Sequence, residues 1–145
     1  MSDQTTVRIL VYSDDRMVRQ TVRFALGTSV GGTGAAERPA IEIVETATQP
    51  AVLAAMDAGD IALAILDGEA VPSGGMGLAH QLKDEIEDCP PILLLVARPA
   101  DSWLAAWSRA EAVMVHPVDP IELVGQVAEL LRERPAVPSA SEAAD

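Results

Sequence analysis

The stretch Ile61-Ala62-Leu63-Ala64-Ile65-Leu66-Asp67 is an unbroken apolar run that ends in a carboxylate. A short continuous run of this kind predicts a strand buried on both faces of a sheet. Similar apolar runs lie on either side of it in the chain, at residues 7–12, 41–44, 92–96 and 112–115. We therefore expect five strands, with the run at 61–66 in the middle of the chain order.

Helical periodicity fills the segments between these runs. Apolar residues spaced by three and four predict helices near residues 15–26, 49–58, 76–87, 101–109 and 119–133. Ser73 is a candidate cap for the third of them, and Asp119-Pro120-Ile121-Glu122 has the cap, proline and glutamate order of a helix start. Strands that alternate with helices predict an α/β fold, doubly wound around a five-stranded parallel sheet. We expect one domain over residues 1–134, followed by a disordered acidic tail over 135–145.

The charge and the length of the apolar runs exclude several classes of function. A net charge of −12 disfavours nucleic acid and anionic membranes as partners. The apolar runs are far shorter than the roughly 20 residues of a membrane span, and the start MSDQTTVRIL has no signal-peptide pattern. The single Cys89 can form no internal disulfide. We expect a cytoplasmic protein without membrane insertion.

Acidic residues follow two of the predicted strands. Asp14 and Asp15 come after the first strand, and Asp67 comes after the third. First and third strands are commonly central neighbours, and sites form at the carboxyl ends of parallel strands, so these carboxylates should converge. Asp14 and Asp67 are therefore candidate ligands for Mg²⁺, which prefers oxygen donors. The alternative is that these acids only cap helices and solvate loops.

The order of these motifs resembles a receiver domain of bacterial response regulators over roughly residues 7–134. Segment 9–15 resembles the family's first strand and acidic cluster, and segment 62–67 resembles the strand that ends in the phosphoacceptor, Asp67. Segments 91–98 and 115–120 resemble the fourth strand and the Lys-Pro turn. The resemblance implies a flavodoxin-like sheet with strand order 2-1-3-4-5. It also implies a cis peptide bond in the turn at His116-Pro117.

Four positions depart from the family pattern. Ser13 stands where the family has its first metal-binding acid, and Val96 stands where it has a hydroxyl that contacts the phosphoryl group. Val113 replaces an aromatic rotamer switch, and His116 replaces the lysine that neutralises the acyl phosphate. Valine donates no hydrogen bond, and a histidine is mostly uncharged at neutral pH. These departures imply an atypical receiver, or pseudo-receiver, in which Asp67 is a degenerate phosphoacceptor.

Two tryptophans lie four residues apart in the predicted fourth helix. The chain has two tryptophans in all, Trp103 and Trp107. Large aromatic residues are by default buried, yet tryptophan is also enriched at the energetic centres of interfaces. The family resemblance places its partner surface on the fourth helix, fifth strand and fifth helix. Trp103 and Trp107 are therefore candidate partner-binding residues.

The first functional hypothesis is a non-enzymatic receiver that acts by protein–protein contact, as an adaptor or an accessory subunit of a larger assembly. It expects no output domain after residue 134, no cofactor and no dependence on phosphorylation. The second hypothesis is a phosphorylatable two-component switch that uses Asp67 with Mg²⁺. A third and weaker hypothesis is a flavin or nucleotide binder. Asp14 and Asp15 argue against it, because their carboxylates would repel a phosphate. The glycine-rich segment 31–34 is interpreted as a connection between elements.

Overall fold

A computed structural model describes residues 6–27, 40–71 and 73–133 of the chain. The glycine-rich segment 31–34 and the predicted tail at 135–145 lie outside these ranges. The strands are β1 (Thr6–Tyr12), β2 (Ala40–Thr46), β3 (Ile61–Asp67), β4 (Ile92–Val96) and β5 (Ala112–Val115). The helices are α1 (Arg16–Leu26), α2 (Gln49–Ala58), α3 (Gly75–Glu85), α4 (Leu104–Ser108) and α5 (Pro120–Glu133).

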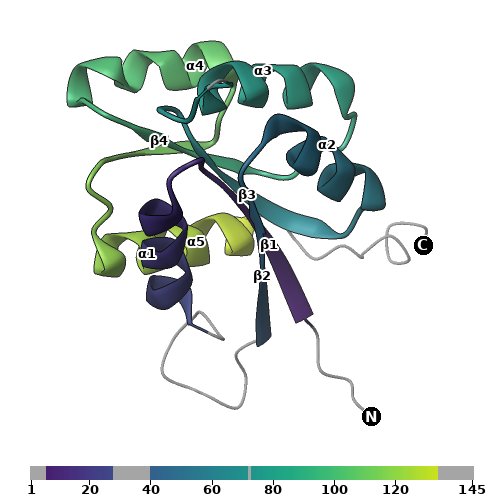
Figure 1. Cartoon of the computed structure of the whole chain (residues 1–145), viewed down its shortest axis with the longest axis horizontal. Coiled ribbons are helices and arrows are strands. Elements are labelled where there is room, and N and C mark those ends of the chain that lie inside the picture. The colour runs from purple at the N-terminus through teal and green to yellow at the C-terminus, as the bar shows by residue number, and fades with distance from the viewer. Residues whose placement is uncertain (1–5, 28–39, 72, 134–145) are drawn as a thin grey trace.

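The strands form one parallel sheet in the order β2-β1-β3-β4-β5, which confirms the predicted topology. Figure 1 shows the helices on both sides of this sheet, with α1 and α5 on one side and α2, α3 and α4 on the other. The order reverses direction next to β1, so the carboxyl ends of β1 and β3 lie at the topological switch point of the sheet.

Two hydrophobic clusters lie on the two faces of the sheet. The first joins alternate residues of β1 and β3, such as Ile9 and Leu63, to the inner faces of α1 and α5. The second joins the intervening residues, such as Leu10 and Leu66, to α2 and α3. Because successive side chains of a strand point to opposite faces, an apolar run buried on both faces supplies both clusters at once. This is why β3 needs an unbroken apolar sequence.

The local signals at the helix ends are only partly those that the sequence predicted. Asp15 caps α1 by accepting a hydrogen bond from the backbone N–H of Met17 at 2.8 Å. The prediction of Ser73 as the cap of α3 is wrong, since the cap position is Gly74 and has no side-chain hydrogen bond. The hydroxyl of Ser73 instead donates to Gln49 of α2 at 2.9 Å.

The predicted fourth helix is divided into two short pieces. A 3₁₀ helix, η2 (Pro99–Trp103), leads directly into α4. A salt bridge between Arg98 and Asp101, at 3.0 Å, lies at the start of η2. Within the described part of the chain, no helix has both the length and the apolar character that a membrane crossing requires.

Candidate functional site

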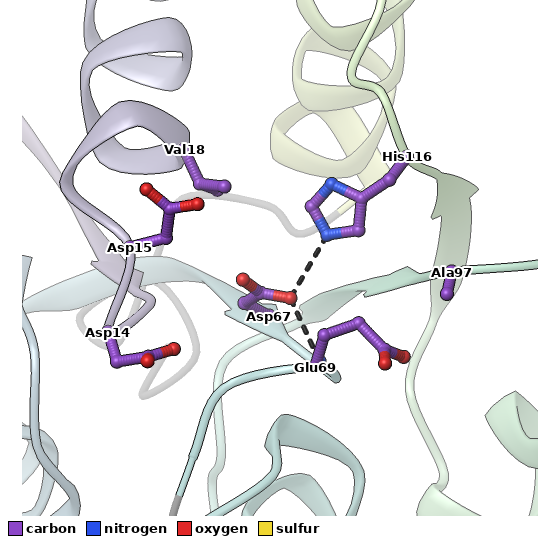
Figure 2. A pocket seen from close by; sticks show the side chains of 7 residues that line it. All are labelled: Asp14, Asp15, Val18, Asp67, Glu69, Ala97 and His116. Carbon is purple, nitrogen blue, oxygen red and sulfur yellow. Dashed lines mark hydrogen bonds and ion pairs between the residues drawn. The ribbon is translucent and has the colours of Figure 1, made fainter.

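The candidate site lies at the carboxyl edge of the sheet, where the predicted acids come together. An open cavity of about 410 Å³ is lined by Asp14, Asp15, Val18, Asp67, Glu69, Ala97 and His116. Figure 2 shows these side chains gathered around the end of β3, with Asp67 between Asp14 and His116. The structure therefore confirms that residues after β1, β3 and β5 share one site.

Asp67 lies at the bottom of the site and is 3% exposed. Its Oδ1 accepts a hydrogen bond from the backbone N–H of Glu69 at 2.9 Å, and the Nε2 of His116 lies 3.0 Å from the same oxygen (Figure 2). Its Oδ2 accepts a hydrogen bond from the hydroxyl of Ser13 at 2.7 Å. Both carboxylate oxygens are thus engaged by groups of the protein itself, as a buried charge requires.

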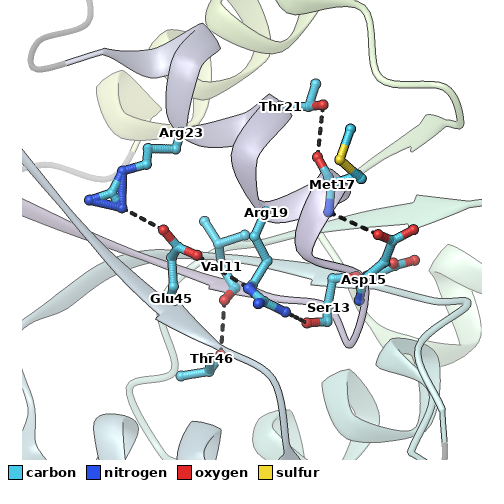
Figure 3. Close-up of polar contacts among 10 residues, drawn as sticks. Val11, Ser13, Asp15, Met17, Arg19, Thr21, Arg23, Glu45 and Thr46 are labelled. Atoms are coloured by element: carbon cyan, nitrogen blue, oxygen red, sulfur yellow. Dashed lines mark hydrogen bonds and ion pairs between the residues drawn. The ribbon is translucent and has the colours of Figure 1, made fainter.

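Ser13 is fully buried, and its position is fixed from several directions. Its backbone N–H donates to the carbonyl of Thr46 on β2 at 3.2 Å, and its hydroxyl accepts from the N–H of Asp15 at 3.0 Å. Figure 3 shows Arg19 of α1 reaching back to the carbonyl of Ser13, at 2.7 Å. The hydroxyl both donates and accepts, so the hydrogen bond to Asp67 is part of a satisfied network.

His116 follows β5 and reaches Asp67 across the end of the sheet. Its backbone N–H donates to the carbonyl of Val96 at 2.8 Å, which extends the pairing of β5 with β4. The peptide bond between His116 and Pro117 is cis, as the family resemblance implied. An ionised carboxylate can only accept hydrogen bonds, so the ring carries its proton on Nε2 in this contact.

The other two departures from the family pattern, Val96 and Val113, do not line the cavity and supply no polar group to it. Val96 ends β4 and is completely buried in the cluster on the α2 and α3 side of the sheet. Val113 on β5 is partly buried and packs against the same cluster. Neither side chain can donate to or accept from an oxygen in the cavity.

Asp14 points toward the loop after β3. Its Oδ1 accepts from the backbone N–H of Val71 at 3.3 Å. Burial raises the pKa of the Tyr12 phenol above its ordinary value of 10.0, and the negative charges of Asp14 and Asp67 raise it further. The Tyr12 hydroxyl donates to the carbonyl of Ser73, at 2.5 Å. Two hydrogen bonds thus connect the loop after β3 to Tyr12 and Asp14, at the end of β1.

The oxygen ligands that this site could offer Mg²⁺ are mainly the carboxylates of Asp14 and Asp67, which line the same cavity. A divalent ion of this kind usually takes one or two carboxylates together with waters and further oxygen donors. Here the Ser13 hydroxyl replaces an acid and occupies Oδ2 of Asp67, and a backbone N–H occupies Oδ1 of Asp14. Across residues 6–27, 40–71 and 73–133, no group of at least three His, Cys, Asp or Glu side chains is arranged to hold a metal ion.

The serine, aspartate and histidine of the site are not ordered as in a nucleophilic triad. A triad needs the histidine next to the hydroxyl, so that the imidazole can take its proton. In this structure Ser13 and His116 contact different oxygens of Asp67, and the carboxylate stands between them. The hydroxyl is therefore a partner of the carboxylate.

The candidate partner residues lie elsewhere, on the outer surface of the molecule. Trp103 is 67% exposed and Trp107 is 51% exposed, so neither belongs to the core. The default expectation that one of them is buried is wrong. No contact with Asp67, Asp14 or the cavity is made by either side chain in the described residues.

Several site residues were not apparent from the sequence. Tyr12 reads as an apolar strand residue, and Glu69 reads as a loop acid. The Tyr12 hydroxyl bonds to the carbonyl of Ser73, 61 residues away in the chain, and the backbone N–H of Glu69 bonds to the Asp67 carboxylate two residues before it. Both residues lie within two positions of a strand end, at β1 and β3. Sites form at the carboxyl ends of such strands, so this proximity could have marked them as candidates.

A five-stranded, doubly wound parallel sheet in the order 2-1-3-4-5, with acids at its switch point, is the architecture of the receiver class of α/β proteins. No family model matches the chain. The chain is 56% identical over 128 residues to an uncharacterized response regulatory protein of Mycobacterium tuberculosis, found under that description in two strains. The match covers 88% of this chain and 93% of the relative. The chain therefore belongs to the response regulators of two-component signalling, as a receiver domain.

Solved structures agree with this fold. The chemotaxis response regulator CheY4 of Vibrio cholerae has a TM-score of 0.70 at 18% identity, over 87% of this chain and 99% of that one. A CheY-like receiver domain protein of Methanospirillum hungatei has a TM-score of 0.68 at 22% identity, over 89% and 96%. At these identities the likeness concerns the fold.

Proposed function

We propose that this receiver acts through protein–protein contact, as an adaptor or accessory subunit, and that it does so without phosphorylation of Asp67 and without catalysis. The observation that supports the proposal is the state of the Asp67 carboxylate. Ser13 holds one of its oxygens, while His116 and a backbone N–H hold the other. A carboxylate in this state is poorly placed to attack a phosphoryl donor.

The electrostatics of the cavity support the same proposal. Four of its seven lining side chains are carboxylates, namely Asp14, Asp15, Asp67 and Glu69. Among the residues that the structure describes, no lysine or arginine lines it. Phosphoryl transfer depends on cationic groups and hydrogen-bond donors aimed at the phosphoryl oxygens. An incoming phosphate would instead meet negative charge, which also disfavours a flavin or nucleotide phosphate.

One observation favours the alternative, a phosphorylatable switch. Asp67 ends β3 and lines the same cavity as Asp14, and Nε2 of His116 lies 3.0 Å from its Oδ1. His116 thus stands beside the carboxylate where the family has its lysine. The alternative therefore predicts Mg²⁺-dependent labelling of Asp67.

Labelling by acetyl phosphate with Mg²⁺ separates the two functions. We expect little or no intact-mass increase for the wild-type chain. The combined variant Ser13→Asp, Val96→Thr, His116→Lys restores an acid, a hydroxyl and a lysine, and we expect it to gain labelling by about 100-fold or more. The same variant with Asp67→Asn is the matched control and should stay unlabelled. Efficient labelling of the wild type, abolished by Asp67→Asn, would establish the alternative.

A further inference from the structure

Arg19 of α1 connects Ser13, at the end of β1, to Glu45 on β2. Its Nε donates to Oε1 of Glu45 at 3.2 Å, and its Nη1 donates to the carbonyl of Ser13 at 2.7 Å (Figure 3). Side chains of a helix lean toward its N-terminus, which directs Arg19 back over the first turn of α1 to the end of β1. Neither Arg19 nor Glu45 lines the cavity that contains Asp67. We call Ser13, Arg19 and Glu45 the arginine clamp.

The arginine clamp is more enclosed than an ordinary surface ion pair. The side chain of Arg19 is 16% exposed and that of Glu45 is 29% exposed. Water and salt screen exposed ion pairs strongly and enclosed ones less. Hydrogen bonds from a charged donor are also stronger than those between neutral groups. Arg19 therefore holds the Ser13 carbonyl in one orientation.

The orientation of the Ser13 backbone determines where its hydroxyl lies. The backbone N–H of Ser13 donates to the carbonyl of Thr46 at 3.2 Å, and its carbonyl accepts from Arg19. With both backbone groups held, Oγ stays where it accepts from the N–H of Asp15 at 3.0 Å. The hydroxyl has one proton to donate, and it donates this proton to Oδ2 of Asp67 at 2.7 Å. The geometry of that hydrogen bond thus depends on the arginine clamp.

We infer that Arg19, anchored by Glu45, is a positioning residue that orients the Ser13 hydroxyl toward Asp67 and so keeps the Asp67 carboxylate hydrogen-bonded. The inference rests on the proposed function, because it explains how Asp67 is kept from attacking a phosphoryl donor. Its test measures how readily the carboxylate reacts with a reagent that contains no phosphate. Labelling of the wild type by acetyl phosphate would refute the proposed function and would leave the outcome of this test unchanged.

The probe is a water-soluble carbodiimide with glycine ethyl ester, which converts an accessible carboxylate into an amide. Peptide mapping by mass spectrometry gives the rate at Asp67, relative to the exposed Glu122 on α5. We expect a slow reaction at Asp67 in the wild type, because this residue is 3% exposed. Ser13→Ala removes the hydrogen bond and should accelerate the reaction about tenfold. Arg19→Gln leaves the hydroxyl in place but no longer oriented, and should accelerate it about fivefold.

Arg23→Gln is the matched control. Arg23 lies on the same helix and donates to the other carboxylate oxygen of Glu45. Among the residues that the structure describes, it has no hydrogen bond to Ser13. Its removal takes away the same charge as Arg19→Gln and should leave the rate at Asp67 within about twofold of the wild type. An acceleration equal to that of Arg19→Gln would overturn the inference.

The double variant Ser13→Ala, Arg19→Gln separates positioning from a general loosening of the fold. A residue that acts only through the Ser13 hydroxyl has no effect once that hydroxyl is gone, so the double variant should react at the rate of Ser13→Ala. Effects that multiply in the double variant would overturn the inference. If far-UV circular dichroism shows that Arg19→Gln does not fold, Glu45→Gln takes its place, because it removes the charge that anchors the guanidinium. An unchanged rate at Asp67 in the folded variant would also overturn the inference.

Discussion

At the scale of the residue, the negative charge of the buried Asp67 carboxylate acts on the phenol of Tyr12 and changes its pKa. Tyr12 is the only tyrosine of the chain, and its hydroxyl donates a hydrogen bond to the carbonyl of Ser73. Burial is the main reason that its pKa lies above 10.0, and Asp14 and Asp67 add to it because they oppose a further negative charge. The spectroscopic titration of one residue therefore measures the charge of the site.

We predict that Asp67→Asn and Asp14→Asn each lower the pKa of Tyr12 toward 10.0, because each removes one nearby negative charge. Tyrosinate absorbance followed through an alkaline titration provides the measurement. The sign of the stability effect follows from the same shift. The folded chain keeps its phenolic proton to higher pH than the unfolded chain, so stability falls as pH rises above about 10. Tyr12→Phe should reduce that alkaline loss, and an unchanged alkaline profile in this variant would contradict the assignment.

The contacts of the site could be predicted only in part from the sequence. Asp14, Asp67 and His116 were found because each follows a recognisable apolar run. The hydrogen bond from Ser13 to Asp67 could not be found in that way, since it depends on how β1 and β3 align. Their register shifts between Arg8 and Ile9, and no local pattern reveals such a shift. Val96 was predictable as an apolar strand end, but its full burial depends on the helices above it.

At the scale of the element, α3 shows how closely the loop after β3 is packed. A Cβ added at Gly75, the first residue of α3, would lie 2.6 Å from the carbonyl oxygen of Asp67. A Cβ added at Gly68 would lie 2.7 Å from the carbonyl oxygen of Leu95 on β4. Both glycines therefore let backbones approach within a distance that any side chain would prevent. A Cβ added at Gly77, two residues further along α3, would meet no described atom within 4 Å.

Gly75→Ala and Gly77→Ala therefore form a matched pair within one helix. We predict that Gly75→Ala lowers the free energy of unfolding by about 1–3 kcal/mol, because the backbone of Asp67 must move to admit the methyl group. Gly77→Ala should raise it by about 0.4–1 kcal/mol, because the helix gains propensity and the unfolded chain loses freedom. Urea denaturation of both variants gives the comparison. Similar effects from both would show that the close approach at Gly75 does not constrain the loop.

The elements themselves were largely predictable, because strand and helix periods are distinct. All five strands and the order of the sheet agree with expectation. The division of the fourth helix into η2 and α4 was not predicted. Its sequence, with Trp103 and Trp107 exposed, lacks the continuous apolar face that would fix a longer helix on the sheet. The cap of α3 was predicted wrongly because the hydroxyl of Ser73 bonds to Gln49 of α2, a contact that the local sequence does not reveal.

At the scale of the whole molecule, the two hydrophobic clusters share the same strands. Leu63 belongs to the cluster under α1 and α5, and Leu66 belongs to the cluster under α2 and α3. Both side chains are completely buried. Since β3 pairs with β1 on one side and β4 on the other, loss of packing on one face should disturb the other.

We predict that Leu63→Ala and Leu66→Ala each lower the free energy of unfolding by about 2–5 kcal/mol. Unfolding should stay two-state, so that far-UV circular dichroism and the near-UV signal of buried Tyr12 change together. Ile121→Ala on α5, where the side chain is 84% exposed, is the control and should shift stability by less than about 0.5 kcal/mol. Separate transitions for the two signals in Leu66→Ala would show that the faces unfold independently.

The edge strand β2 has a consequence for behaviour at high concentration. It ends the strand order, and strands in that position can template fibrils by adding the same strand from another molecule. Glu42 and Glu45 lie along it and form ion pairs with Arg8 and with Arg19 and Arg23. The chain as a whole carries a net charge of −12, so a second copy is repelled from this outermost strand. Acidification that brings the net charge of the chain toward zero should therefore shorten the lag time of aggregation.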